Sequence, residues 1–203
     1  MAGKVHPNGL GINLKPKKEK ELVKWFLACL LFGKVKFIKS DKKLEQMKSL
    51  VVFYSMTGTT KKVAETIRKI LKCDSEEILD MRPRKGVLGY LRSGKEAMLK
   101  NLCKIKEAKK NPALYDLTII GTPVWSFNVS SPVRAYLHHN KEKFSRVAFF
   151  CTMGGSGGKN AFAEMEKICG KGPVALLELR AREVANNKLM AKVKAFASEI
   201  INS

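Results

Sequence analysis

The sequence predicts an α/β fold of three layers, in which helices cover both faces of a five-stranded, doubly wound parallel sheet. Short apolar runs typical of buried strands alternate with segments of helical periodicity from Ser49 onward. This strict alternation favours parallel strands, because each parallel connection needs a crossover that is usually a helix. The length of 203 residues and the hydrophobic content of 45% suit one sizeable core with an extension.

Apolar runs bounded by polar residues locate the strands. The expected strands are Leu50–Tyr54, Glu76–Met81, Leu117–Gly121, Val147–Cys151 and Val174–Leu179. In such sheets ligands bind beyond the carboxyl ends of the strands, near the point where the strand order reverses. The loops after the first, third and fourth strands are therefore the candidate binding loops.

Helices are expected between the strands, where apolar residues recur every three or four positions. A helix is expected near Tyr90–Leu102, and Ser131-Pro132 reads as a helix N-cap followed by proline at the first helical position. The apolar faces of the other helices are Val63, Ile67, Ile70 and Leu71; Phe162, Met165 and Ile168; and Leu189, Val193, Phe196 and Ile200.

Residues 1–48 are expected to form a basic N-terminal extension, and residues 49–203 the main domain. Within the extension, Lys17–Phe32 reads as a helix that ends at Gly33. Its apolar stretch Trp25–Phe32 is far shorter than the roughly 20 residues that span a bilayer. We therefore expect no transmembrane segment and a cytoplasmic protein.

The net charge of +21 is spread along the chain, with +8 in residues 1–48 and +13 in the remainder. A solvated basic surface is the favoured interpretation, with an acidic protein or nucleic acid partner as the alternative. The five cysteines form no CxxC pair, so we expect reduced thiols and no metal site.

The first candidate loop joins a strand to a helix and holds hydroxyl residues around one glycine. A helix N-terminus offers unpaired N–H groups and a partial positive charge, which together can bind an anion. The nucleotide-binding patterns GxxxxGK[ST] and GxGxxG are both absent. An ordinary turn rich in capping residues is the alternative. The loop consists of Ser55, Met56, Thr57, Gly58, Thr59 and Thr60.

The second candidate loop lies within Gly121–Pro132 and carries two aromatic residues in a polar context. An aromatic at a strand's carboxyl end can form the wall of a pocket for a flat ligand. The alternative is that Trp125 folds back onto the core. The candidate residues are Thr122, Pro123, Val124, Trp125, Ser126, Phe127 and Asn128.

The third candidate loop follows the fourth strand and is rich in glycine, which lets the backbone approach a ligand closely. A flexible surface loop is the alternative. Cys151 borders this loop and could be redox-active, although a buried cysteine at a strand end is the favoured interpretation. The candidate residues are Thr152, Met153, Gly154, Gly155, Ser156, Gly157 and Gly158.

Three motifs in this order resemble those of the flavodoxin-like family over residues 49–203. They are Ser55-Met56-Thr57-Gly58-Thr59-Thr60, the stretch DLTIIGTPVW from Asp116 to Trp125, and the glycine-rich stretch Thr152–Gly157. The segment Arg84–Arg92 points the same way. The resemblance implies a strand order of 2-1-3-4-5. The family commonly has a glycine directly after the aromatic of the second loop, where this chain has Ser126.

The resemblance implies that the ligand is flavin mononucleotide (FMN). Its phosphate would lie on the first loop, and its isoalloxazine ring between the second and third loops, with Trp125 as the main ring contact. Backbone groups of Thr152–Gly158 would bind the pyrimidine edge. Flavodoxins are usually acidic, whereas residues 49–203 carry +13.

The leading functional hypothesis is an FMN-binding protein of electron transfer, acting with a redox partner protein or a small-molecule acceptor. The alternative is an NAD(P)H- or quinone-dependent FMN reductase, although the sequence shows no nicotinamide site and no catalytic acid or base. A third hypothesis is a docking protein that uses residues 1–48 to bind a partner or nucleic acid. So short a helix cannot read bases alone, which weighs against nucleic acid.

Overall fold

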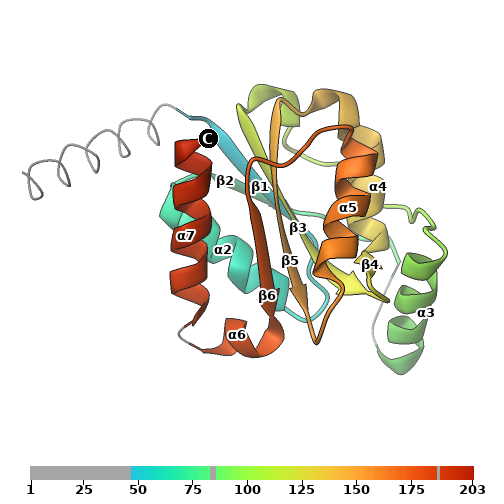
Figure 1. Cartoon of the computed structure of the whole chain (residues 1–203). Helices are drawn as coiled ribbons and strands as arrows, with labels where there is room; N and C mark the ends of the chain where they lie inside the picture. Colours follow the sequence, from blue (N-terminus) through green and yellow to red (C-terminus); the bar gives the residue numbers. More distant parts are fainter. Residues whose placement is uncertain (1–46, 83–85, 187) are drawn as a thin grey trace, which may run out of the picture. The chain divides into compact units, whose positions relative to one another are not determined.

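The computed structural model describes residues 47–82, 86–186 and 188–203. These residues form a central sheet with helices on both faces (Figure 1). The predicted extension, residues 1–48, lies outside the described residues except for Met47 and Lys48, so its helix stays a prediction. In the part of the chain that is described, no helix is long and apolar enough to cross a membrane.

Five parallel strands form the body of the sheet in the order β2-β1-β3-β5-β6. Counted along the chain without the short β4, this is the predicted order 2-1-3-4-5. Strand β4 (Asn128–Val129) was not predicted, and it pairs antiparallel with the end of β3. The main strands are β1 (Ser49–Phe53), β2 (Asp74–Glu77), β3 (Leu117–Trp125), β5 (Arg146–Met153) and β6 (Leu176–Arg180).

The longer helices divide between the two faces of the sheet. Helices α2 and α7 lie on one face, and α4 and α5 on the other (Figure 1). The helices are α2 (Thr59–Leu71), α3 (Gly86–Met98), α4 (Ser131–Asn140), α5 (Gly158–Cys169), α6 (Ala181–Ala185) and α7 (Lys188–Asn202), with 3-10 turns η2 (Pro112–Leu114) and η3 (Lys141–Lys143).

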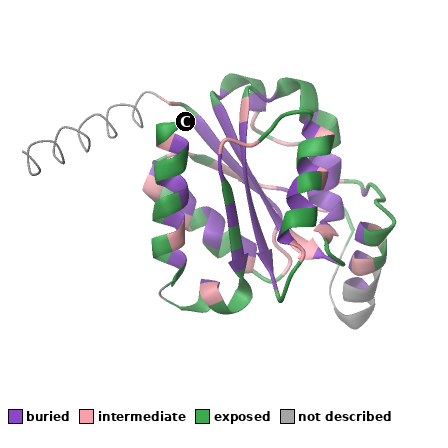
Figure 2. Ribbon diagram, viewed as in Figure 1, coloured by how far each residue is buried: buried purple, intermediate pink, exposed green. Residues whose placement is uncertain are grey.

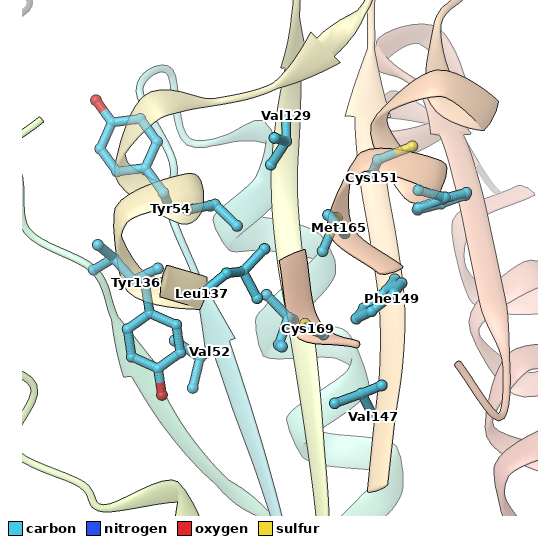
Figure 3. Packing of buried hydrophobic residues seen from close by; sticks show 14 of the residues in the cluster. Val52, Tyr54, Val129, Tyr136, Leu137, Val147, Phe149, Cys151, Met165 and Cys169 are labelled. Carbon is cyan, nitrogen blue, oxygen red and sulfur yellow. The ribbon is translucent and has the colours of Figure 1, made fainter. Parts of the chain in front are cut away.

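The sheet is buried on both faces, which explains why its central strands read as continuous apolar runs (Figure 2). Val52 of β1 packs into the cluster under α4 and α5, whereas its neighbour Val51 packs into the cluster under α2 and α7. Alternate residues of a strand point to opposite faces, so both must be apolar here. Figure 3 shows the first cluster, to which Phe149 of β5 and Met165 of α5 both belong.

The edge strand β2 differs from its prediction. It spans Asp74–Glu77, earlier than the expected Glu76–Met81, and Asp80 instead bridges to Ile105. Its sequence DSEE carries no apolar signal, because an edge strand pairs through its backbone on one side and can expose its side chains. Pairing with β1, rather than apolar burial, decides where this strand lies.

Two helix starts were also misplaced. Helix α3 spans Gly86–Met98, several residues before the expected Tyr90–Leu102. Helix α4 has Ser130 as its N-cap, not Ser131. The Ser130 hydroxyl bonds to that of Thr122 at 3.0 Å, whereas the buried Ser131 hydroxyl has no hydrogen-bond partner among the described residues. A contact with β3 therefore fixes this helix start, and sequence periodicity does not show such a contact.

Candidate functional site

The first candidate loop forms a tight turn between β1 and α2 whose hydrogen bonds centre on Ser55. The Ser55 hydroxyl oxygen accepts the N–H of Gly58 at 3.1 Å and the N–H of Lys61 at 3.2 Å. Gly58 is the N-cap of α2 and adopts a left-handed backbone with φ of 88°. Glycine reaches this conformation without steric cost, so the turn depends on this residue.

Four main-chain donors of this turn have no acceptor in the part of the chain that the structure describes. Within the described residues, the N–H groups of Met56, Thr57, Thr59 and Thr60 make no hydrogen bond. The first N–H groups of a helix have no intrahelical partner, and they carry the positive end of the helix dipole. An anion with several oxygens would satisfy such a set of donors.

The first and third loops are joined by a buried hydrogen bond. The hydroxyls of Thr60, in the first turn of α2, and Thr152, near the end of β5, lie 2.7 Å apart. Both side chains are almost fully buried. These two predicted residues therefore hold the loops together, and their hydroxyls are engaged within the protein.

The second loop is a β-hairpin, which the sequence did not predict. Strand β3 continues to Trp125, and Trp125 pairs with Asn128 across a two-residue turn. The turn residues Ser126 and Phe127 both adopt left-handed backbone, with φ of 46° and 61°. This is the pattern of a type I′ turn, which matches the twist of a hairpin but normally takes Asn or Gly.

A left-handed conformation costs about 1–2 kcal/mol for a residue with a side chain. This conformation is especially unusual for a bulky residue such as Phe127. Phe127 is also 62% exposed, so burial of its ring does not hold it there. Strained backbone of this kind clusters at functional sites, where the surrounding structure maintains it. Ser126 occupies the position at which the resemblance implies a glycine, and its φ explains that preference.

Trp125 is packed into the protein interior. Its side chain is only 7% exposed, and its ring meets that of Tyr54 edge-to-face with centroids 5.6 Å apart. Tyr54 directly follows β1, so this contact joins the carboxyl ends of β1 and β3. Trp125 thus folds back onto the core, as the alternative interpretation of this residue expects.

The second and third loops touch at Gly157. A side-chain carbon at this position would lie 2.7 Å from the Phe127 backbone, which is too close for any residue except glycine. Gly157 also has a φ of 107° and is the N-cap of α5. The absence of a side chain at Gly157 and its left-handed backbone thus allow the hairpin turn to lie against the third loop.

The predicted residues divide into accessible and buried sets. The accessible or half-buried ones are Ser55, Met56, Thr57, Gly58, Thr59, Pro123, Val124, Ser126, Phe127, Asn128, Gly154, Gly155, Ser156 and Gly157. The buried ones are Thr60, Thr122, Trp125, Thr152, Met153 and Gly158. The accessible set offers backbone groups and Phe127 to a ligand, whereas the buried set positions the loops.

Arg134 was missed by the sequence reasoning. It lies in α4 with only 2% of its surface exposed, and it donates to Glu164 of α5 and, at 3.0 Å, to the Asn128 side chain of the hairpin. Lys100 also pairs with Glu164 at 2.8 Å. The sequence signal for this residue was an arginine within the apolar stretch SPVRAYL, since a buried arginine needs a partner.

The pKa of Glu164 reflects these contacts. Its partial burial alone would raise the pKa of the carboxyl group, but hydrogen bonds from Lys100 and Arg134 outweigh that effect and hold the pKa below its ordinary value. Glu164 is therefore charged at neutral pH. It compensates the buried guanidinium that positions the second loop.

Cys151 is fully buried beside the third loop. Burial strongly raises the pKa of its thiol, because a thiolate would be poorly solvated there. Redox reactivity requires an accessible thiolate, so this environment favours a structural role. Cys73, Cys103 and Cys169 are also free thiols. Among the residues that the structure describes, no cluster of three or more His, Cys, Asp or Glu could hold a metal ion.

Fold and loops together define a doubly wound α/β protein with a turn at the carboxyl edge of its sheet whose backbone N–H groups point to anion binding. The chain belongs to the flavodoxin family, whose sequence model, described as Flavodoxin, matches residues 48–193. None of the curated proteins compared with the chain matches it.

Several solved structures resemble the chain. A flavoprotein in complex with FMN from Lactobacillus acidophilus is 26% identical, with a TM-score of 0.58 over 68% of this chain and 97% of that one. A proposed flavoprotein from Bacteroides eggerthii is 25% identical, with a TM-score of 0.63 over 78% and 99%. Oxidised flavodoxin 2 from Bacillus cereus is 19% identical, with a TM-score of 0.50 over 76% and 98%, and it supports the fold alone.

Proposed function

We propose that the chain binds FMN at the three loops and acts in electron transfer. The observation that carries this proposal is the set of four N–H groups in the turn from Met56 to Thr60 that have no partner among the described residues. Membership of the flavodoxin family and the FMN complex of the Lactobacillus acidophilus relative support the identity of the ligand.

The phosphate of FMN would accept hydrogen bonds from the N–H groups and hydroxyls of the first loop. Lys61 lies next to the turn, but its ammonium group pairs with Glu77 at 2.9 Å. Backbone donors and the α2 dipole would therefore carry most of the interaction with the phosphate. An arrangement without a dedicated cation is suited to holding a phosphate and does not resemble a nucleotide-hydrolysing loop.

The isoalloxazine ring would lie against the second and third loops. In the proposed site the small exposed edge of Trp125 would meet the ring, and Phe127 offers the larger accessible aromatic surface. The exposed Gly154, Gly155 and Ser156 leave their backbone close to the ligand. The bound flavin would supply the redox chemistry, and the loops would orient it and limit its contact with water.

A negative charge introduced at Thr57 tests whether the first loop holds the phosphate of FMN. The change Thr57→Glu should weaken FMN binding at least about tenfold, because a carboxylate would face the phosphate in place of a hydroxyl. Riboflavin, which lacks the phosphate, should bind both proteins with similar affinity. Equilibrium dialysis measures both ligands.

Two control variants accompany this test. Thr57→Gln changes the shape at the same position without the charge, and Thr66→Glu adds the same charge further along α2. Both should retain most of the FMN affinity. Equal loss of FMN and riboflavin in Thr57→Glu would show that the loop does not hold the phosphate.

Electron transfer is tested with the FMN-loaded protein in the absence of any partner. We expect little steady oxidation of NADH or NADPH with a quinone as acceptor, and rapid oxidation of the chemically reduced flavin by a one-electron acceptor. Sustained turnover of either nicotinamide without a partner would instead establish the reductase alternative.

A further inference from the structure

We propose that the redox partner of this protein is an acidic protein that docks on a basic surface around the flavin site. This inference rests on the proposed function, because the partner must approach the flavin edge. The surface, called the basic rim, is defined by exposed cations at the carboxyl edge of the sheet. They are Lys62, Arg82, Lys159, Arg182 and Lys188.

Topology brings these residues to one edge. Lys62 and Lys159 lie in the first turns of α2 and α5, directly after the first and third candidate loops. Side chains of a helix lean toward its N-terminus, so both lysines lean toward the loops. Arg82 lies a few residues after the end of β2 in the chain. Arg182 belongs to α6, which directly follows β6 and lies near the lower edge of the view in Figure 1.

The rim cations form no ion pairs with the carboxylates that the structure describes. None of the five has an ion pair within the described residues. Two acidic residues nearby contact other parts of the protein. Glu183 pairs with Lys192 at 3.0 Å and caps the N–H of Arg180, and the Glu178 side chain lies against the N-terminus of α5 at Gly158.

An exposed aromatic on the same edge favours a protein over a small anion. Phe127 lies in the hairpin turn against Gly157, so it belongs to the loops that the rim surrounds. Protein interfaces commonly place an aromatic at the centre and charged residues around it. Opposite charge on the partner would speed association and orient it toward the flavin.

The electron balance of the step is simple. The reduced FMN hydroquinone gives two electrons and two protons as it returns to the oxidised flavin. One electron passes to each of two ferric haems, which become ferrous, and the protons pass to the solvent. A haem protein is therefore a suitable probe, because each electron transferred changes its absorbance.

The experiment compares two forms of one acceptor, basic cytochrome c and the same protein made acidic by succinylation of its lysines. The FMN-loaded chain is photoreduced under argon with a tertiary amine as electron donor, then mixed with each acceptor in a stopped-flow instrument. With the succinylated form, the rate should fall as ionic strength rises from about 10 mM to about 0.3 M. With the native form, it should rise.

Helix α5 provides a matched pair of variants. Lys159 lies in its first turn and Lys167 in its last, both exposed, and separated by eight residues or about 12 Å along the axis. Lys159→Glu should slow reduction of the acidic acceptor about fivefold at low ionic strength, whereas Lys167→Glu, with the same net charge, should change it less than twofold.

The outcomes separate the two proposals. Failure of FMN to bind in a titration would overturn the proposed function itself. Two results would overturn the partner inference alone, provided that FMN binds normally. One is an electron-transfer rate that depends on ionic strength in the same way for both acceptors. The other is an equal change of this rate in Lys159→Glu and Lys167→Glu. Tight binding of a DNA duplex that Lys159→Glu abolishes, without preference for the acidic acceptor, would assign the rim to nucleic acid instead.

Discussion

The hydroxyls of Thr60 and Thr152 lie 2.7 Å apart in the protein interior and join the first turn of α2 to the end of β5. The two residues are 92 positions apart in the sequence, and each belongs to a different candidate loop. Their hydrogen bond therefore fixes the spacing between the turn that would hold the phosphate and the loop that would hold the flavin ring.

Thr60→Val should lower the free energy of unfolding by about 2 kcal/mol, because it leaves the buried Thr152 hydroxyl without a partner. Thr152→Val should have a similar effect. The double variant should cost less than the sum of the two, since no unpaired hydroxyl remains. Urea unfolding of the apoprotein measures the three changes, and strict additivity would show that the hydroxyls do not interact.

Gly157→Ala should destabilise the protein by about 2 kcal/mol and weaken FMN binding. The added carbon meets the Phe127 backbone, and the φ of 107° is unfavourable for alanine. Gly155→Ala in the same loop is the control, because nothing lies within 4 Å of its added carbon. Thermal unfolding of the apoprotein distinguishes the two variants, and equal losses of stability would contradict the close contact at Gly157.

Phe127→Asn should raise the stability of the apoprotein by up to about 1 kcal/mol, because asparagine tolerates the left-handed backbone better than phenylalanine. The same change should weaken FMN binding severalfold if the exposed ring contacts the flavin. These effects have opposite signs, so a folding defect cannot imitate them. Unchanged FMN affinity would remove Phe127 from the proposed site.

Arg134→Met should cost about 3 kcal/mol of stability, because it leaves the mostly buried Glu164 carboxylate without its buried partner. Lys100→Met removes an exposed partner of the same carboxylate and should cost at most about 1 kcal/mol. Chemical unfolding at neutral pH gives both values. Equal costs would show that burial of the arginine does not matter.

The lowered pKa of Glu164 predicts a pH dependence. Its pKa in the folded protein lies below the ordinary value of 4.5, so the stabilisation is present above pH 4.5 and is lost as pH falls through the folded pKa. Glu164→Gln should be less stable than the native protein at neutral pH and should lose less stability on acidification. Parallel unfolding curves from pH 7 to pH 3 would contradict this role.

Apart from the edge strand β2, the sequence by itself determined the parallel sheet and the edge where its loops converge. Residues such as Val51 and Val52 must be apolar on both faces of a buried strand, and the alternation with helices leaves a parallel sheet as the favoured arrangement. Parallel strands end at one edge, so the candidate loops at Ser55, Thr122 and Thr152 could be placed together without a structure.

The tertiary structure alone decided how those loops are built. The left-handed turn at Ser126-Phe127 contains no asparagine or glycine from which it could be predicted. The turn lies in close contact with Gly157 of the third loop. Burial of Trp125 depends on Tyr54, and the role of Arg134 depends on Glu164 from another helix. Local patterns report periodicity and turn preference, whereas these features arise from contacts between residues far apart in the chain.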